Sequence, residues 1–478
     1  MSNNMLFRAL VPDAPLNRRT EGDVDGFSPF SGSKKWNNAF LEKSSIPGLE
    51  KPSLVSSCKG SISRILFCFP AFSVKEPDRQ GYRSVISALR PGTQFVVAHH
   101  VSIKAEIASW LTQAGHQLSD VAFIPIPDHT KLTDWAEDAY VCLTDLADGS
   151  RYLAEPWRFL RSGDALIADA VEEYTDIVAT QVPLIFQGGN CLIGDNFWML
   201  GKDYFADTVA ALTNGELPIK IAEGANVNQV ASKLFQDHID KERKLILIGS
   251  KNPISMARYF GSKEDGEYYL DMPAEGMGTY QPIFHIDMFV TLAGTNQDGI
   301  AQVLVGSPSM GDRFLKTNSP FAHDAVYDAI AKSLGESGFS VKRNPIVHRA
   351  TVGRKLSLAA LQDMARATGD QKVDKDFAYA IAELAAAGAT SDTAVSVRSW
   401  HHVTWNNCLV EDSKTHGRHV YIPTYGHEPN NDLAVIDREM EALWAGLGFT
   451  VHLLGDFNSF ARRQGVVHCI KKYIERGD

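Results

Sequence analysis

The alternation of short apolar runs with amphipathic segments constrains the fold of this chain most strongly. Runs rich in β-branched and aromatic residues occur at 64–70, 93–100 and 121–127, and the segment 101–116 has apolar residues at helical spacing. Short runs of the first kind are typical of strands, whereas apolar residues three to four positions apart are typical of helices. We therefore expect an α/β protein.

The same pattern continues towards the C-terminus. Segment 182–201 has the form of a hairpin, with Gly-Asp-Asn at its turn. No exact repeat is present, but a recurring β-rich unit with one helix is compatible with this order. The other expected strands are 244–250, 284–294, 301–309, 419–426 and 449–456, and the other expected helices are 324–339 and 432–448.

Composition suggests three parts along the chain. Residues 1–60 are rich in Ser, Asn, Gly, Pro and charge, which is typical of an extended leader. Residues 61–478 carry the strand and helix pattern and are expected to form the main domain. Within it, the segment of about 355–390 is expected to be an all-helical insertion.

Charge and cysteine content limit the class of protein. The formal net charge is -10, which argues against nucleic-acid binding, since that needs concentrated Lys and Arg. The six cysteines form no CxxC pair, so neither a disulfide framework nor a structural zinc site is expected. We find no secretory signal and no apolar stretch long enough to span a bilayer. A cytoplasmic enzyme without a membrane or nucleic-acid partner is expected.

Reactive side chains are concentrated in four short segments, 134–140, 186–195, 284–289 and 464–474. Taken singly, each has an ordinary structural explanation, such as a buried histidine or a turn. If 284–289 were a strand, His285 and Asp287 would share one face, and a polar pair on a buried face needs water or a functional cavity. The paired glycines before Asn190 would let the backbone approach a ligand closely.

Five motifs in this order resemble the guanidino-group-modifying enzymes, which include arginine, agmatine and peptidylarginine deiminases and amidinotransferases. They are Trp135-x-x-Asp138, Gly188-Gly189-Asn190, His285-x-Asp287, Thr404 to Asn407 and His468-Cys469. The resemblance covers about residues 63–475. It implies a pentein fold for residues 61–478, an α/β propeller of five pseudo-symmetric ββαβ-type units around a central active-site channel.

The resemblance also implies roles for particular residues. Cys469 would be the nucleophile, His285 the general acid/base, and Asp138 and Asp287 the carboxylates that bind a guanidinium. A guanidinium is a planar cation with paired N–H donors, so two carboxylates can bind it bidentately and fix its plane. The supporting substrate-binding residues would be Asn190, Trp135 and Asn407, and no metal or cofactor is expected.

The expected activity is hydrolysis of a guanidino group through a covalent thiouronium on the cysteine, giving a ureido product and ammonia. The substrate would be arginine, agmatine or peptidyl-arginine. An amidinotransferase on the same fold, a catalytically inactive pentein that binds a ligand, and an unrelated cysteine hydrolase remain alternatives. The oligomeric state is open.

Some positions depart from the family pattern. Agmatine deiminases have Arg and Glu where this chain has Glu137 and Gln187, and the glycine run before His-Cys is reduced to a single Gly465. On a strand His468 would face away from Cys469, so it receives no chemical role. Arg398 is expected to form a surface salt bridge.

Overall fold

The computed structural model describes residue 10 and residues 49–478, apart from 256–257, 274–277, 322 and 368–370, and without the side chains of 371–374. Most of the expected leader lies outside these residues. In its last part, β1 (Pro52–Leu54) pairs antiparallel with β5 (Val141–Asp145). The division into leader and main domain stays a prediction.

The described strands form five sheets in which one order of elements recurs. In one sheet β5 is antiparallel to β6 (Arg151–Glu155), and α5 (Ile167–Tyr174) then leads to β7 (Ile177–Gln181), which is parallel to β6. A helix between parallel strands is the usual crossover, because such strands cannot be joined by a tight turn. The recurring unit is therefore ββαβ.

Three further sheets repeat this unit. The hairpin expected at 182–201 is confirmed as the antiparallel pair at the start of one of them. The first of these units consists of β8 (Cys191–Ile193), β9 (Phe197–Gly201), the helices α6 (Lys202–Thr213) and α7 (Val227–His238), and β10 (Lys244–Ile248). The second consists of β13 (Val290–Thr295), β14 (Ala301–Ser307), the helices α8 (Pro308–Leu315) and α9 (Asp324–Glu336), and β15 (Ser340–Ser357). The third consists of β17 (Leu409–Ser413), β18 (Gly417–Thr424), α12 (Ala434–Gly446) and β19 (Thr450–Asp456).

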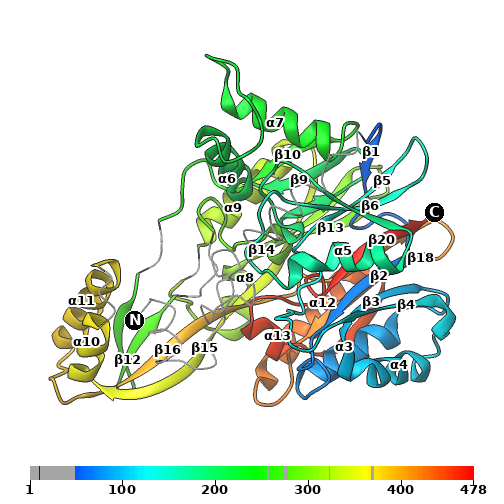
Figure 1. Ribbon diagram of the computed structural model, residues 1–478. Coiled ribbons are helices and arrows are strands. Elements are labelled where there is room, and N and C mark those ends of the chain that lie inside the picture. Colours follow the sequence, from blue (N-terminus) through cyan, green and yellow to red (C-terminus); the bar gives the residue numbers. More distant parts are fainter. Residues whose placement is uncertain (1–9, 11–48, 256–257, 274–277, 322, 368–370) are drawn as a thin grey trace.

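The fifth sheet joins the two ends of the described chain. Here β20 (Lys471–Gly477) is antiparallel to β2 (Ser61–Phe69), as Figure 1 shows beside the C-terminus. The strands and helix expected between 64 and 127 are confirmed. They are β2, β3 (Gln94–His100), α4 (Lys104–Gln113) and β4 (Val121–Ile126). A helix that was not expected, α3 (Asp78–Ala88), connects β2 to the parallel strand β3, so β20, β2, α3 and β3 form the fifth ββαβ unit.

The sheet of β13 to β15 is extended by three more strands. β15 pairs antiparallel with β16 (Ala394–Thr404), which is followed by β12 (Glu267–Met272) and β11 (Phe260–Glu264). Between β15 and β16 the chain forms α10 (Leu358–Arg366) and α11 (Gln371–Ala386), which lie at the outer end of these long strands in Figure 1. These helices fall in the segment expected to be helical, and its status as an insertion stays a prediction.

Two expected strands in the reactive segments are wrong. His285 precedes a single 3-10 turn, η5 (Ile286–Met288), in which the Met288 amide donates to the His285 carbonyl at 3.3 Å, and β13 starts only at Val290. Likewise, residues 467–470 form a turn and β20 starts at Lys471. Face alternation along a strand therefore says nothing about His285, Asp287 or His468.

These two turns lie inside the largest hydrophobic core. Ile286, Met288 and Val467 belong to it together with Cys469. The reactive segments are thus enclosed by apolar packing.

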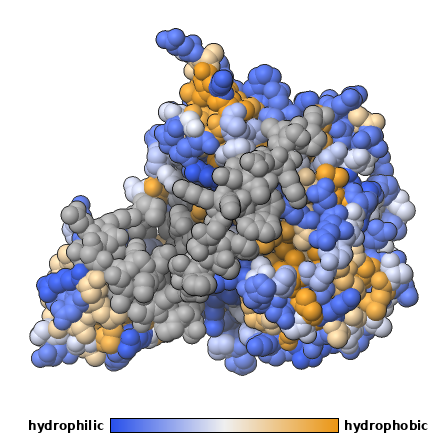
Figure 2. Space-filling model, in the orientation of Figure 1, coloured by the Kyte–Doolittle hydropathy of each residue, from blue (hydrophilic) through white to orange (hydrophobic). Residues whose placement is uncertain are grey.

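On the face drawn in Figure 2, hydrophilic residues prevail along the outline and hydrophobic residues form scattered patches. Among the helices of the described residues, none has the length and apolar character that crossing a membrane requires.

Candidate active site

Five buried polar residues occupy corresponding positions in the five ββαβ units. Each lies one to three residues before the first strand of its unit, and each is at most 1% exposed. The repeated topology therefore brings five remote segments to equivalent places. In chain order the residues are Asp138 before β5, Asn190 before β8, Asp287 before β13, Asn407 before β17 and Cys469 before β20.

The thiol of Cys469 is held by an amide and faces a carboxylate. The side-chain Nδ2 of Asn407 lies 3.2 Å from Sγ, and its Oδ1 accepts the backbone N–H of Cys469 at 3.2 Å. On its other side, Sγ is 3.7 Å from Oδ2 of Asp287. Both Asn407 and Asp287, as predicted, therefore lie beside the predicted nucleophile.

Asp287 is held by the histidine next to Cys469. His468 Nδ1 donates to Asp287 Oδ2 at 2.9 Å, whereas Asp287 Oδ1 is buried without a hydrogen-bond partner among the described residues. Burial lowers the pKa of His468 to about 4, helped by the nearby Lys471 and opposed by Asp287, so the imidazole is neutral at pH 7. The expectation that His468 faces away from the site is wrong, because this segment is a turn.

His285 lies between a neutral amide and the first carboxylate. Its Nε2 is 2.7 Å from Gln187 Oε1 and its Nδ1 is 3.7 Å from Asp138 Oδ1. An amide oxygen only accepts, so Nε2 carries the proton in this contact. Gly189 permits this approach, since a Cβ there would lie 2.5 Å from Nδ1 of the imidazole.

Asp138 is engaged by a cation of the chain itself. Arg161 Nη2 donates to Asp138 Oδ2 at 2.7 Å, and Arg161 Nε donates to Asp164 Oδ2 at 2.6 Å. The guanidinium also lies over the Phe159 ring, 4.8 Å from its centroid. Arg161 was missed by the sequence analysis, because the loop that carries it has neither periodicity nor a motif.

Asn190 and Trp135, which were predicted to bind substrate, both have partners within the protein. Asn190 Oδ1 accepts the backbone N–H of Ile286 at 2.9 Å, which fixes the turn between His285 and Asp287. Trp135 is packed by the Arg463 guanidinium, 5.3 Å from its ring centroid. Asn190 thus positions two of the predicted site residues.

A buried ion cluster joins the segment of Asp138 to that of Cys469. Glu137 accepts from Lys471 Nζ at 2.7 Å and from Lys472 Nζ at 2.8 Å, and its backbone N–H donates to the Cys469 carbonyl at 3.1 Å. Burial lowers the pKa of Lys471 to about 8, while Glu137 opposes this shift. Glu137, which departs from the family pattern, is thus a structural residue here.

The other buried thiols lack such surroundings. Burial raises the pKa of Cys191 and of Cys408 to about 12, so both are protonated at neutral pH.

Arg398 was expected on the surface, but it is 9% exposed and its guanidinium binds Asp271 and Glu264, each at 2.7 Å. It belongs to the sheet of β12 and β16 and not to the site.

A small cavity adjoins the carboxylate of Asp287. Asp287 and His468 line it together with Asn406 and Cys408, and it has room for about one water molecule. Water therefore fits beside the carboxylate and the neutral imidazole.

Comparisons with known proteins identify the fold. No family model and no curated protein matches the sequence. The solved structure of a putative agmatine deiminase is similar over 89% of this chain and 96% of its own, with 12% identity and a TM-score of 0.50. The agmatine deiminases of Enterococcus faecalis and C. jejuni also match at 12% identity, with TM-scores of 0.49 and 0.47, covering 90% and 89% of this chain and 97% of each of theirs. The likeness confirms the expected α/β class and shows that the fold is similar to that of the pentein enzymes.

Proposed function

We propose that this chain, which has the fold of the guanidino-group-modifying enzymes, hydrolyses the guanidino group of arginine, agmatine or peptidyl-arginine. One observation carries the proposal. The Cys469 thiol lies 3.7 Å from the buried carboxylate of Asp287, whose Oδ1 has no hydrogen-bond partner among the described residues. A buried carboxylate beside a thiol suits a cation whose central carbon is the electrophile.

The five ββαβ units are proposed to surround a pseudo-fivefold axis as the blades of an α/β propeller. Five sheets with one recurring order of elements support this arrangement. The buried polar residue before each first strand supports it further, since equivalent positions in such units lie near the axis. The central channel would then be the active site.

Asp287 and Asp138 are proposed to bind the two edges of the substrate guanidinium. His468 holds Asp287 Oδ2 and Arg161 holds Asp138 Oδ2. The Oδ1 atoms would accept substrate N–H groups, which fixes the plane of the cation and lets Sγ approach its carbon from one face. Trp135 and Asn407 would support this binding.

The first half of the proposed reaction forms the covalent intermediate. Arrival of the cation favours transfer of the Cys469 thiol proton to His285, because the positive charge stabilises a thiolate that lies beside the carboxylate of Asp287. Sγ adds to the guanidino carbon, the carbon–nitrogen bond breaks, and the leaving nitrogen takes a proton from His285 and departs as ammonia. A thiouronium on Cys469 remains.

The second half is hydrolysis. Water gives a proton to His285 and forms a bond to the carbon of the thiouronium, and the carbon–sulfur bond then breaks to release Cys469 as thiolate. The sum is guanidinium plus water giving a ureido product plus ammonium. These steps use only side chains of the protein and water.

The test is an assay of the purified full chain with arginine, agmatine, methylated arginines and an arginyl peptide, measuring ammonia and ureido product. We expect turnover of at least one of these by the wild type and none by Cys469→Ala. Cys58→Ala is the matched control, since Cys58 is also buried but lies outside the site, with a pKa that burial raises to about 11. Equal turnover by wild type and Cys469→Ala would remove this thiol from the mechanism.

The same assay separates the alternatives. An amidinotransferase would release the first amine and build a new guanidino compound when glycine or another amine is added as acceptor. A ureido product formed in the presence of that acceptor would support hydrolysis. Tight binding of a guanidine without any turnover by the wild type would instead favour a binding protein.

A further inference from the structure

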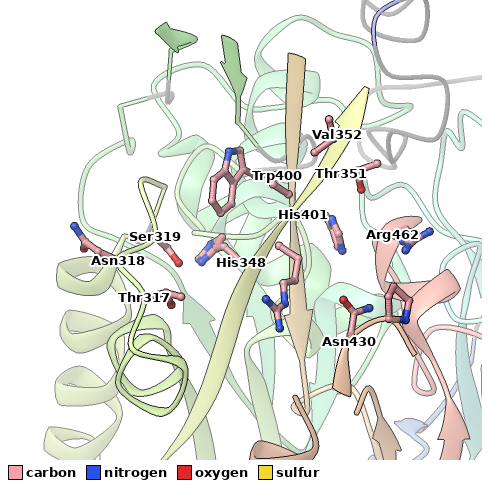
Figure 3. A pocket seen from close by; sticks show the side chains of 13 residues that line it. Thr317, Asn318, Ser319, His348, Thr351, Val352, Trp400, His401, Asn430 and Arg462 are labelled. Carbon is pink, nitrogen blue, oxygen red and sulfur yellow. The ribbon is translucent and has the colours of Figure 1, made fainter. Parts of the chain in front are cut away.

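A second pocket lies beside β15 and β16, apart from the cysteine site. Its volume of about 450 Å³ is within the range of pockets for small ligands. Neither Cys469 nor either predicted guanidinium-binding carboxylate lines it. Its polar lining residues include Ser319, His348, Arg349, His401, Asn430 and Arg462. Figure 3 labels all of these except Arg349.

Two of these residues form a cross-strand pair, and each has a side-chain nitrogen without a hydrogen-bond partner among the described residues. Arg349 on β15 lies directly opposite His401 on β16, so both side chains are on one face of the two-stranded ribbon. Arg349 Nη2 donates to the carboxylate of Asp432, but its Nε is buried without a hydrogen-bond partner. His401 is 5% exposed, and its Nδ1 is likewise buried and without a partner.

Two further polar groups face this pair from other segments. Arg462 ends α13 (Asn458–Arg462), and in the part of the chain that the structure describes it forms no ion pair. Asn430 precedes the 3-10 turn before α12. In Figure 3 the side chains of Asn430 and Arg462 lie on the same side of β16 as the imidazole of His401.

We propose that this pocket binds a small oxyanion, a phosphate or a carboxylate, between Arg349, His401 and Arg462. An oxyanion would accept from the guanidinium groups of Arg349 and Arg462 and from an N–H of the His401 imidazole, since all three residues line the pocket. The planar guanidinium groups of the two arginines suit the geometry of either anion. The inference does not rest on the proposed hydrolysis.

The charges around the pocket favour an anion over a metal ion. Burial lowers the pKa of His401 to about 3, and Arg462, His348 and Arg349 lower it further. A neutral imidazole among cations is the environment that an incoming negative charge relieves. Among the described residues, no group of three or more His, Cys, Asp or Glu could hold a metal ion.

The test is isothermal titration of the full chain with inorganic phosphate, and separately with acetate, at an ionic strength kept constant with chloride. We expect saturable binding of phosphate, of acetate or of both by the wild type, and the stronger titration identifies the class of anion. Arg349→Met and Arg462→Met are each expected to weaken this binding at least tenfold. Arg438→Met is the matched control, because Arg438 is exposed on α12 and does not line the pocket, and it should bind as the wild type does.

Arg349 also binds Asp432, so its replacement could weaken anion binding by disturbing the fold. A second measurement, which does not depend on this variant, is therefore needed. Histidine nitrogen NMR of the wild type should show one imidazole whose resonances move with phosphate, and that signal should be missing from His401→Gln. Two results would overturn the proposal. One is the absence of any binding above the chloride background, and the other is binding that Arg349→Met and Arg462→Met both leave unchanged.

Discussion

Arg161 Nη2 lies 2.7 Å from Asp138 Oδ2, and the two side chains are only 9% and 0% exposed. The carboxylate predicted to bind a substrate guanidinium therefore already binds a guanidinium of the chain. Asp138 Oδ1, which faces His285 at 3.7 Å, is the oxygen directed towards the site. In the proposed function, Arg161 would thus set the orientation in which Asp138 receives the substrate cation.

Replacing Arg161 should lower stability. Arg161→Met removes one partner of a buried ion pair, which typically costs about 3–5 kcal/mol. Urea unfolding should show a loss of this size in the free energy of unfolding, and agmatine or free guanidinium at low concentration should stabilise this variant more than the wild type. Arg158→Met is the control, since Arg158 and Glu216 are 58% and 36% exposed and such pairs contribute less than about 1 kcal/mol. A loss no larger than that of the control would contradict the role of Arg161.

Replacing Gln187 by Glu should move the pH dependence of catalysis. Gln187 Oε1 is 2.7 Å from His285 Nε2, and a carboxylate at this place favours the protonated imidazole. The limb of the kcat/KM profile that depends on His285 should shift to higher pH by about 1 to 2 units. Gln117→Glu adds the same charge on an exposed position and should leave the profile in place. An unshifted profile in Gln187→Glu would mean that His285 is not the acid/base group.

The sequence was sufficient for the elements with a strong pattern. β2, β3 and β4 were predictable because each is a short apolar run, and the hairpin of β8 and β9 because Gly-Asp-Asn marks its turn. Their order also predicted the α/β class. The resemblance located Asn407 and Asp287, which do lie beside Cys469.

The sequence was insufficient where a turn and a strand have the same local pattern. Alternation of His285, Ile286, Asp287 and Met288 predicts a strand, but a 3-10 turn with Ile286 and Met288 in the core gives the same alternation. In the turn His285 faces Gln187, while Asp287 faces Cys469. Partners of this kind come from remote segments, so a single sequence does not reveal them.

His468 is expected to position Asp287. Its neutral Nδ1 donates to Asp287 Oδ2 at 2.9 Å. His468→Phe should lower kcat/KM at least tenfold and stability by about 1–3 kcal/mol, because a buried acceptor loses its donor. His468→Asn keeps a side-chain N–H donor and should recover part of both. A purely structural role would be indicated if His468→Phe lost stability but kept the kcat and KM of the wild type.

Acid should destabilise the protein through its buried histidines. Burial lowers the pKa of His468 and of His348 to about 4 and that of His401 to about 3, from an ordinary value of 6.5. Because the unfolded chain binds these protons and the folded chain does not, stability is complete above pH 6.5 and falls as the pH drops towards 4.

Each of these groups should contribute about 1 kcal/mol per pH unit within that window. Urea unfolding at pH 7, 6 and 5 should therefore show a decrease in the free energy of unfolding that becomes smaller in His348→Phe. His129→Asn, at an exposed position, should retain the slope of the wild type. Glu155 acts in the opposite direction, because burial raises its pKa well above the usual range, so the comparison between variants isolates the histidine. An identical slope in His348→Phe and the wild type would show that this imidazole does not stay neutral in the folded state.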